Sequence, residues 1–224
     1  MVDQPWFPVM ADDEYPCVLS ESEQVFITAL RAAADAWRAE PADTWVWRLW
    51  DEPPLLIAVS LADPQTRSGL GIFGVHLIDG RMRGDRLHSQ LYDLPERPSS
   101  VAVDSTGGPS ELVGRCASWF EAVLRKPVVR YEWLHEGAVY ADRYLFADSG
   151  EGLTQRYVRS LAPWGQADRL TAAGHVHGKG WIQTAGLGVP DRFVHVRGDR
   201  DQAVIPAGVA EVAVPCSTSG IRYE

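Results

Sequence analysis

The feature that most constrains the fold is a pair of segments, residues 128–135 and 138–146, joined by Glu136-Gly137. Both segments are rich in aromatic and β-branched residues, and a residue pair of this kind between such segments is typical of a tight hairpin turn. Two antiparallel strands cannot bury an apolar face by themselves. The hairpin therefore predicts a larger sheet with at least one further layer against it.

The register of this hairpin decides which side chains share a face. With a two-residue turn and no bulge, Trp133 lies opposite Tyr140, and Tyr131 lies opposite Asp142. One face is then strongly aromatic. The other face carries charged side chains, namely Arg130, Glu132 and Arg143. We expect the aromatic face to form the interior of the protein.

Two amphipathic helices are predicted. Ser20 and Glu23 have the spacing of a capping box, and apolar residues then recur every three or four positions until the next proline. In the second helix, Pro109 fits a first helical position, and an apolar stripe that begins at Leu112 ends before Pro127. We expect this second stripe to pack against the aromatic face of the hairpin.

Other short runs complete the expected architecture. They predict strands at residues 44–50, 55–61, 72–78, 101–103, 192–197 and 209–214, and one through Tyr157. Strands outnumber helices and most connections are short. We therefore predict an α+β fold, in which the two main amphipathic helices pack on one face of an antiparallel or mixed sheet. Residues 1–19 are expected to form an irregular N-terminal arm, and residues 20–224 a single domain.

Charge and cysteine usage restrict the expected partners and compartment. The formal net charge is −9, and residues 1–60 hold eleven acidic and three basic residues. This imbalance argues against nucleic acid as a partner. No apolar run approaches the length of a membrane span. Three widely spaced cysteines and an acidic N-terminus favour a reduced, cytoplasmic setting. Two lysines against nineteen arginines, with no asparagine, indicate a GC-rich bacterial genome.

Histidines supply one candidate for chemistry. His175 and His177 would point the same way on an extended segment, so two imidazoles could bind one transition metal, with His195 or Asp191 as a third ligand. A solvated or hydrogen-bonded turn explains the same pattern. Apart from such a divalent transition metal, no cofactor is expected, because phosphate-binding and dinucleotide-binding glycine motifs and the common hydrolase motifs are absent.

Asp142 and the tryptophans supply further candidates. In the predicted register, burial beside Tyr131 would raise the pKa of Asp142 and suit it to acid–base work, unless a Tyr hydroxyl or an Arg satisfies it or it lies at the open edge of the sheet. The run from Trp45 through Trp47 to Trp50 places aromatic groups on both faces of a strand, so that either both faces are covered or one is open to a ligand. We include Trp181 with these residues as a candidate ligand or partner surface.

Two functional hypotheses follow. The first is a non-enzymatic binding domain that recognises a protein or a small apolar ligand through aromatic residues on the sheet and an acidic N-terminal segment. The second is a small enzyme with a histidine-based, metal-containing site within residues 165–195. Stoichiometric metal would favour the enzyme, and a salt-sensitive protein partner would favour the binding domain.

Overall fold

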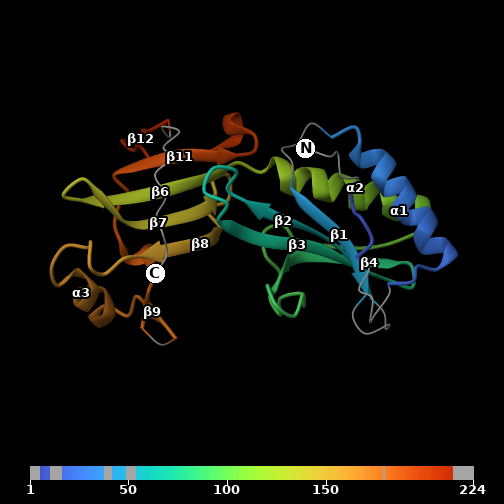
Figure 1. Cartoon of the computed structure of the whole chain (residues 1–224), viewed down its shortest axis with the longest axis horizontal. Helices are drawn as coiled ribbons and strands as arrows, with labels where there is room; N and C mark the ends of the chain where they lie inside the picture. The colour runs from blue at the N-terminus through green and yellow to red at the C-terminus, as the bar shows by residue number, and fades with distance from the viewer. Residues whose placement is uncertain (1–5, 11–16, 38–41, 49–53, 179, 214–224) are drawn as a thin grey trace. The chain divides into compact units, whose positions relative to one another are not determined.

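The computed structural model describes residues 6–10, 17–37, 42–48, 54–178 and 180–213, and it divides into two compact units (Figure 1). Residues 1–62 and 69–125 form the first unit, and residues 63–68 and 126–224 form the second. Each unit has a five-stranded sheet of its own. That residues 20–224 form a single domain stays a prediction. The turn between the second and third strands belongs to the second unit although both strands belong to the first.

The sheet of the first unit has five antiparallel strands in chain order. They are β1 (Asp43–Arg48), β2 (Leu55–Ala62), β3 (Gly69–Ile78), β4 (Arg81–Leu87) and β5 (Val103–Thr106). Asp79 and Gly80 join β3 to β4 with φ angles of 46° and 70°, in the left-handed region that a tight hairpin turn requires. β2 is the most buried of these strands, with Leu55, Leu56 and Ile57 almost inaccessible to solvent.

Two helices accompany this sheet. α1 (Glu21–Ala34) begins at the predicted capping box, in which the Glu23 amide donates to the Ser20 hydroxyl at 3.3 Å and the Ser20 amide donates to the Glu23 carboxylate at 2.8 Å. α2 (Pro109–Arg125) has the predicted apolar stripe on its buried side. α1 packs on α2, and α2 contacts β4 and β5.

The described part of the N-terminal arm also packs into the first unit. Phe7 is fully buried, and its ring centroid lies 5.1 Å from that of Phe120 on α2 and 6.0 Å from that of Trp37. Val9 forms an isolated parallel bridge with Val46 of β1. An aromatic side chain in the arm thus contributes to the core, although the arm has no regular element of its own among the described residues.

The second unit has a mixed five-stranded sheet with the order β12-β11-β6-β7-β8, in which only the β11–β12 pair is parallel. Its strands are β6 (Val128–His135), β7 (Ala138–Phe146), β8 (Gly152–Tyr157), β11 (Arg192–Arg197) and β12 (Ala210–Glu211). Between β8 and β11 lie α3 (Gln166–Ala172), the β9 (Val176–His177) and β10 (Trp181–Ile182) pair, and the short helix η2 (Thr184–Gly186). A second short helix, η3 (Arg200–Gln202), follows β11.

The mixed α+β content is confirmed, with twelve strands and three α-helices among the described residues. The prediction of two main helices omitted α3. This helix has seven residues, and its N-cap is Gly165, with φ 72° and no side-chain capping bond. A helix so short and without a side-chain cap gives little periodic or capping signal in the sequence.

The predicted bounds of the β6–β7 hairpin are confirmed, but its register is corrected by a β-bulge. Leu134 pairs with Val139 as predicted, whereas Trp133 pairs with Ala141, so Tyr140 is an extra residue on β7. An extra residue on one strand shifts every later pair by one position. The register predicted without a bulge is therefore wrong by one residue for Trp133 and for every β6 residue before it.

The layer order predicted for the hairpin is also wrong. Trp133 and Tyr140 are buried, but they pack in one cluster with Leu170 of α3, Ile182 and Leu187, and not against the stripe of α2. On α2, the Trp119 indole nitrogen donates to the Val101 carbonyl at 2.6 Å. The alternation of side chains along the two strands indicates which face of the hairpin has to be buried. It does not indicate which helix covers that face. Among the described helices, none is both long and apolar enough to cross a membrane.

Candidate binding surface on the second unit

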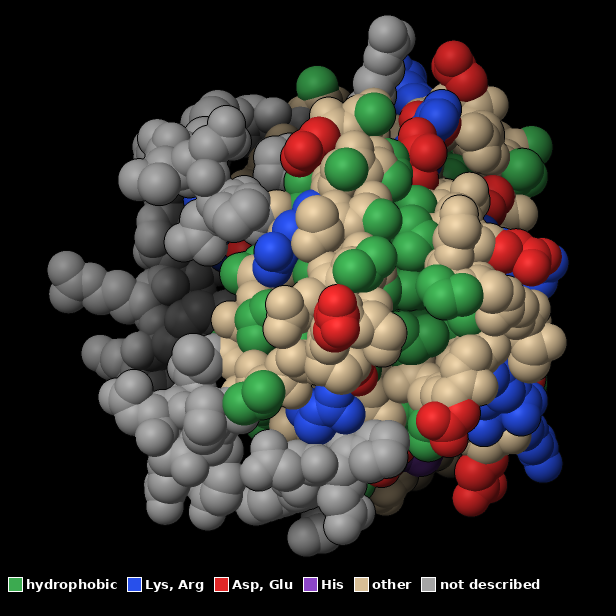
Figure 2. All heavy atoms as spheres, turned by 90° about the vertical axis from the view of Figure 1, so that its right-hand side faces the viewer, with side chains coloured by type: hydrophobic (Ala, Val, Ile, Leu, Met, Phe, Trp, Pro, Cys, Tyr) green, Lys and Arg blue, Asp and Glu red, His purple; other side chains and the backbone are tan. Residues whose placement is uncertain are grey.

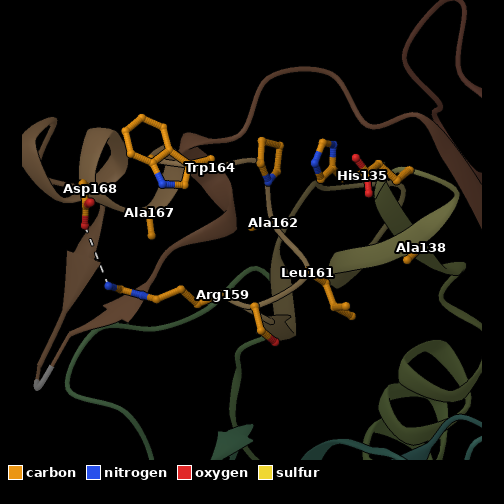
Figure 3. A pocket seen from close by; sticks show the side chains of 12 residues that line it. His135, Ala138, Arg159, Leu161, Ala162, Trp164, Ala167 and Asp168 are labelled. Atoms are coloured by element: carbon orange, nitrogen blue, oxygen red, sulfur yellow. Dashed lines mark ion pairs between the residues drawn. The ribbon is translucent and has the colours of Figure 1, made fainter.

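Trp164 is the most exposed large apolar side chain of the described residues. It lies in the connection between β8 and α3, between Pro163 and Gly165, and 96 % of its surface is accessible (Figure 3). Proline and glycine suit a tight turn, and a turn on the surface directs the intervening side chain outward. Trp164 therefore presents an accessible aromatic side chain at this turn of the second unit.

The segment that carries Trp164 is fixed to the sheet by Gln166, the first residue of α3. Its side-chain nitrogen donates to the Tyr140 hydroxyl at 3.0 Å, and its side-chain oxygen accepts from the Tyr157 hydroxyl at 3.1 Å. Burial raises the pKa of Tyr157. The start of α3 is therefore held by two strands, and the connection before it has a defined position on the second unit.

A cavity of about 560 Å³ adjoins Trp164 (Figure 3). One wall is the β6–β7 turn with His135 and Glu136, and the other is the connection from Arg159 to α3. Arg159 is 3.8 Å from Asp168, and the side chains of this pair are 65 % and 82 % accessible. Such a long, exposed ion pair contributes little stability, so both side chains can change partners at small cost.

A second cavity, of about 350 Å³, adjoins Trp181, whose side chain is 72 % accessible. Its lining contains two cations, Arg156 and Arg159, together with Tyr157, and no acidic residue among those described. Because Arg159 lines both cavities, the two hollows are neighbours on the second unit. We call the residues Trp164, Trp181, Arg156, Tyr157 and Arg159 the Trp164–Trp181 surface.

Asp142 lies just below this surface and not on it. It is 6 % accessible. Arg156 donates from Nε to its carboxylate at 2.7 Å, and the Nη2 atom of Arg156 forms an ion pair with the same oxygen at 2.5 Å. In the corrected register Asp142 faces Glu132 and Arg156, not Tyr131. Burial raises the pKa of Asp142, while Arg156 opposes that shift. An arginine therefore satisfies this carboxylate.

Asp142 belongs to a network of charged side chains on one face of the sheet. Glu132 is also buried and accepts from Arg130 at 2.8 Å and from Arg192 at 2.6 Å. Two buried carboxylates opposite each other resemble an acid–base pair. However, each is held by arginine, and neither lines any of the three cavities described in this subsection. The arrangement is that of a structural network that reaches the surface through Arg156.

The three candidate metal ligands are not brought together. His177 lies on β9 opposite Trp181, His175 precedes β9 and contacts Gly186, and His195 lies on β11 opposite Val129. Among the residues described, no group of three or more His, Cys, Asp or Glu side chains could hold a metal ion. The Nε2 atom of His195 is buried without a hydrogen-bond partner. Metal binding by these histidines stays a prediction without a supporting geometry.

The first unit holds the other tryptophan candidates. Trp45 and Trp47 are half-buried and lie edge-on to Tyr92, with ring centroids 6.2 Å and 5.7 Å apart. They pack on Leu56 and a loop after β4. Trp50 lies outside the described residues. Next to this loop is a third cavity, of about 390 Å³, lined by residues that include Leu87, Leu91, Leu94 and Arg97.

A further apolar area is visible from the side of the molecule on which α1 is labelled. Figure 2 shows hydrophobic side chains gathered across the middle of that face, with charged groups at its edges. Such a band without a distinctive polar group gives no indication of what would bind there. The Trp164–Trp181 surface is chemically more specific, because it combines aromatic side chains with cations and hollows.

Sequence reasoning named Trp181 and Asp142 but missed Trp164, Arg156 and Arg159. A signal for Trp164 was present, since a tryptophan between proline and glycine is expected in a surface turn. The arginines gave no signal, because their positions depend on the order of strands in the second sheet. Comparisons with protein-family models, with curated proteins and with solved structures find no match to this chain.

Proposed function

We propose that the protein is a non-enzymatic binding protein, whose second unit recognises a protein partner through the Trp164–Trp181 surface. The observation that carries this proposal is the pair of tryptophans, 96 % and 72 % accessible, beside two adjoining hollows that share Arg159. Tryptophan, tyrosine and arginine are the residue types that contribute most binding energy at protein interfaces. All three occur together here.

The composition of the cavities favours a protein over a small apolar ligand. Small-molecule sites are mostly enclosed and apolar, with few polar groups. The larger cavity instead includes His135, Glu136, Arg159 and Asp168, and Trp164 projects beside it almost fully in solvent. Mixed polar and aromatic lining on an accessible surface fits the side chains of another protein.

The test removes the two aromatic anchors. We expect Trp164→Ala and Trp181→Ala each to weaken partner binding by roughly ten-fold or more, because hot-spot truncation costs about 2 kcal/mol. The partner is first identified by capture on the immobilised protein and mass spectrometry. Its dissociation constant is then measured for the wild type, for each variant and for the double variant.

Val189→Ala is the matched control. Val189 is also in the second unit and is 70 % accessible, but it lines neither cavity. Its replacement should leave both affinity and thermal stability unchanged. A double tryptophan variant that captures the same proteins with unchanged affinity would show that this surface is not the binding surface.

A further inference from the structure

Two arginines line the cavity beside Trp181, and the carboxylates that pair with them, Asp142 and Asp168, lie outside its lining. Arg156 and Arg159 both line it, and its described residues include no carboxylate. Arg156 uses Nε and Nη2 on a single oxygen of Asp142, and its side chain remains 55 % accessible. Among the described residues, the ion pair of Arg159 is the 3.8 Å contact with the exposed Asp168. Both arginine side chains are thus paired and yet more than half exposed, so that a ligand can approach them from solvent.

Arginine at this position indicates a carboxylate as the complementary group. A guanidinium presents a planar set of donors that matches a carboxylate in a bidentate arrangement. Arg156 is also oriented by its bonds to Asp142, so less side-chain entropy is lost when it binds a second group. A partner that brings a lysine or arginine into this cavity would instead meet two like charges.

The distribution of charge over the whole surface argues against a uniform polyanion. Glu136 and Asp168 line the cavity beside Trp164, whereas the cavity beside Trp181 is cationic. A nucleic-acid strand carries a phosphate at every step and would meet both acidic residues. A peptide segment can place acidic residues at one end only, and its aliphatic or aromatic side chains can pack on tryptophan.

On the basis of the proposed function, we infer that the Trp164–Trp181 surface binds a partner segment in which one or more acidic residues accompany an aromatic or aliphatic anchor. The acidic side chains bind Arg156 and Arg159, and the anchor packs against the exposed tryptophans. This assignment rests on charge complementarity and on the shared position of Arg159 between the two cavities.

The experiment is a selection from a random peptide library displayed on phage, with the full chain as bait. We expect the selected peptides to be enriched in Asp or Glu next to an aromatic or aliphatic residue. Bait carrying Arg156→Gln and Arg159→Gln should lose the acidic enrichment and bind the wild-type peptides roughly ten-fold or more weakly. Binding to the wild type should also weaken as salt is added.

Arg200→Gln is the matched control, since Arg200 is an exposed arginine of the second unit outside both cavities. It should select the same peptides as the wild type. Peptides that depend on the tryptophans but show no acidic preference would overturn this inference and leave the proposed function in place. Failure of the wild type to select any peptide better than the Trp164→Ala, Trp181→Ala variant would overturn both.

Self-association is tested in parallel by analytical ultracentrifugation. A dimer that the tryptophan substitutions dissociate would identify a second copy as the occupant and would overturn the assignment to a separate partner. A monomer at the bait concentration supports the assignment, because the surface is then available to another protein.

Discussion

Asp63 receives four hydrogen bonds within the second unit. The amides of Gln65 and Thr66 donate to it at 2.8 Å and 3.2 Å, the Tyr144 hydroxyl at 2.9 Å, and Arg130 at 3.2 Å. Burial opposes the charge of Asp63, but these bonds outweigh burial and hold its pKa below the ordinary value. The ionised carboxylate therefore stabilises the folded state.

Replacing Asp63 with asparagine should destabilise the protein by about 2 kcal/mol near neutral pH, because Arg130 and Tyr144 lose an anionic acceptor. A lowered pKa in the folded state means that this stabilisation is present above the unfolded pKa and is lost as pH falls through the folded value. The difference between wild type and variant should shrink in acid. Denaturant unfolding across a pH series measures it.

Asp142→Asn is the control with the opposite sign. Because burial raises the pKa of Asp142, its contribution is present below the unfolded pKa and is lost as pH rises through the folded value. The wild type should therefore lose stability relative to this variant as pH rises through that range. Identical pH profiles for the two asparagine variants would contradict both assignments.

At the scale of elements, the sequence predicted the features of helices and strands that depend on residues close together in the chain. The cap at Ser20, the stripe of α2 and the ends of the β6–β7 hairpin are set by spacing within a few residues, and the structure confirms them. The bulge at Tyr140 and the placement of α3 depend on contacts distant in sequence. The positions of Arg156 and Arg159 also depend on contacts distant in sequence, and the sequence therefore did not show them as candidates. Trp181 was a candidate because of its residue type.

Close strand packing in the first sheet gives a prediction of its own. A side chain at Gly74 of β3 would place its Cβ 2.8 Å from the backbone oxygen of Ile57 and 2.6 Å from Leu87. Backbone cannot move aside cheaply, so Gly74→Ala should destabilise the protein by about 2 kcal/mol. Denaturant unfolding should show a lower midpoint.

Gly69→Ala is the matched control for this effect. Gly69 lies on the same strand, and a Cβ there would meet nothing within 4 Å. Its replacement should change the free energy of unfolding by less than about 0.5 kcal/mol. Equal destabilisation by both alanines would show that loss of glycine, and not the close approach, determines the effect.

For the whole molecule, the exposure of tryptophan can be measured directly. The chain has nine tryptophans, and of those described only Trp164 and Trp181 are exposed. Trp164→Phe with Trp181→Phe should therefore remove most of the fluorescence that acrylamide quenches readily. The thermal midpoint should hardly change, because surface substitutions are usually within about 0.5 kcal/mol of neutral. Unchanged quenching would contradict the exposure of these side chains.

Since residues 63–68 belong to the second unit, that unit is not encoded by one uninterrupted stretch of the gene. A transplanted piece covering only 126–224 would arrive without the carboxylate that Arg130 and Tyr144 bind. Any chimaera that aims to transfer the Trp164–Trp181 surface to another scaffold has to supply a substitute for that six-residue turn.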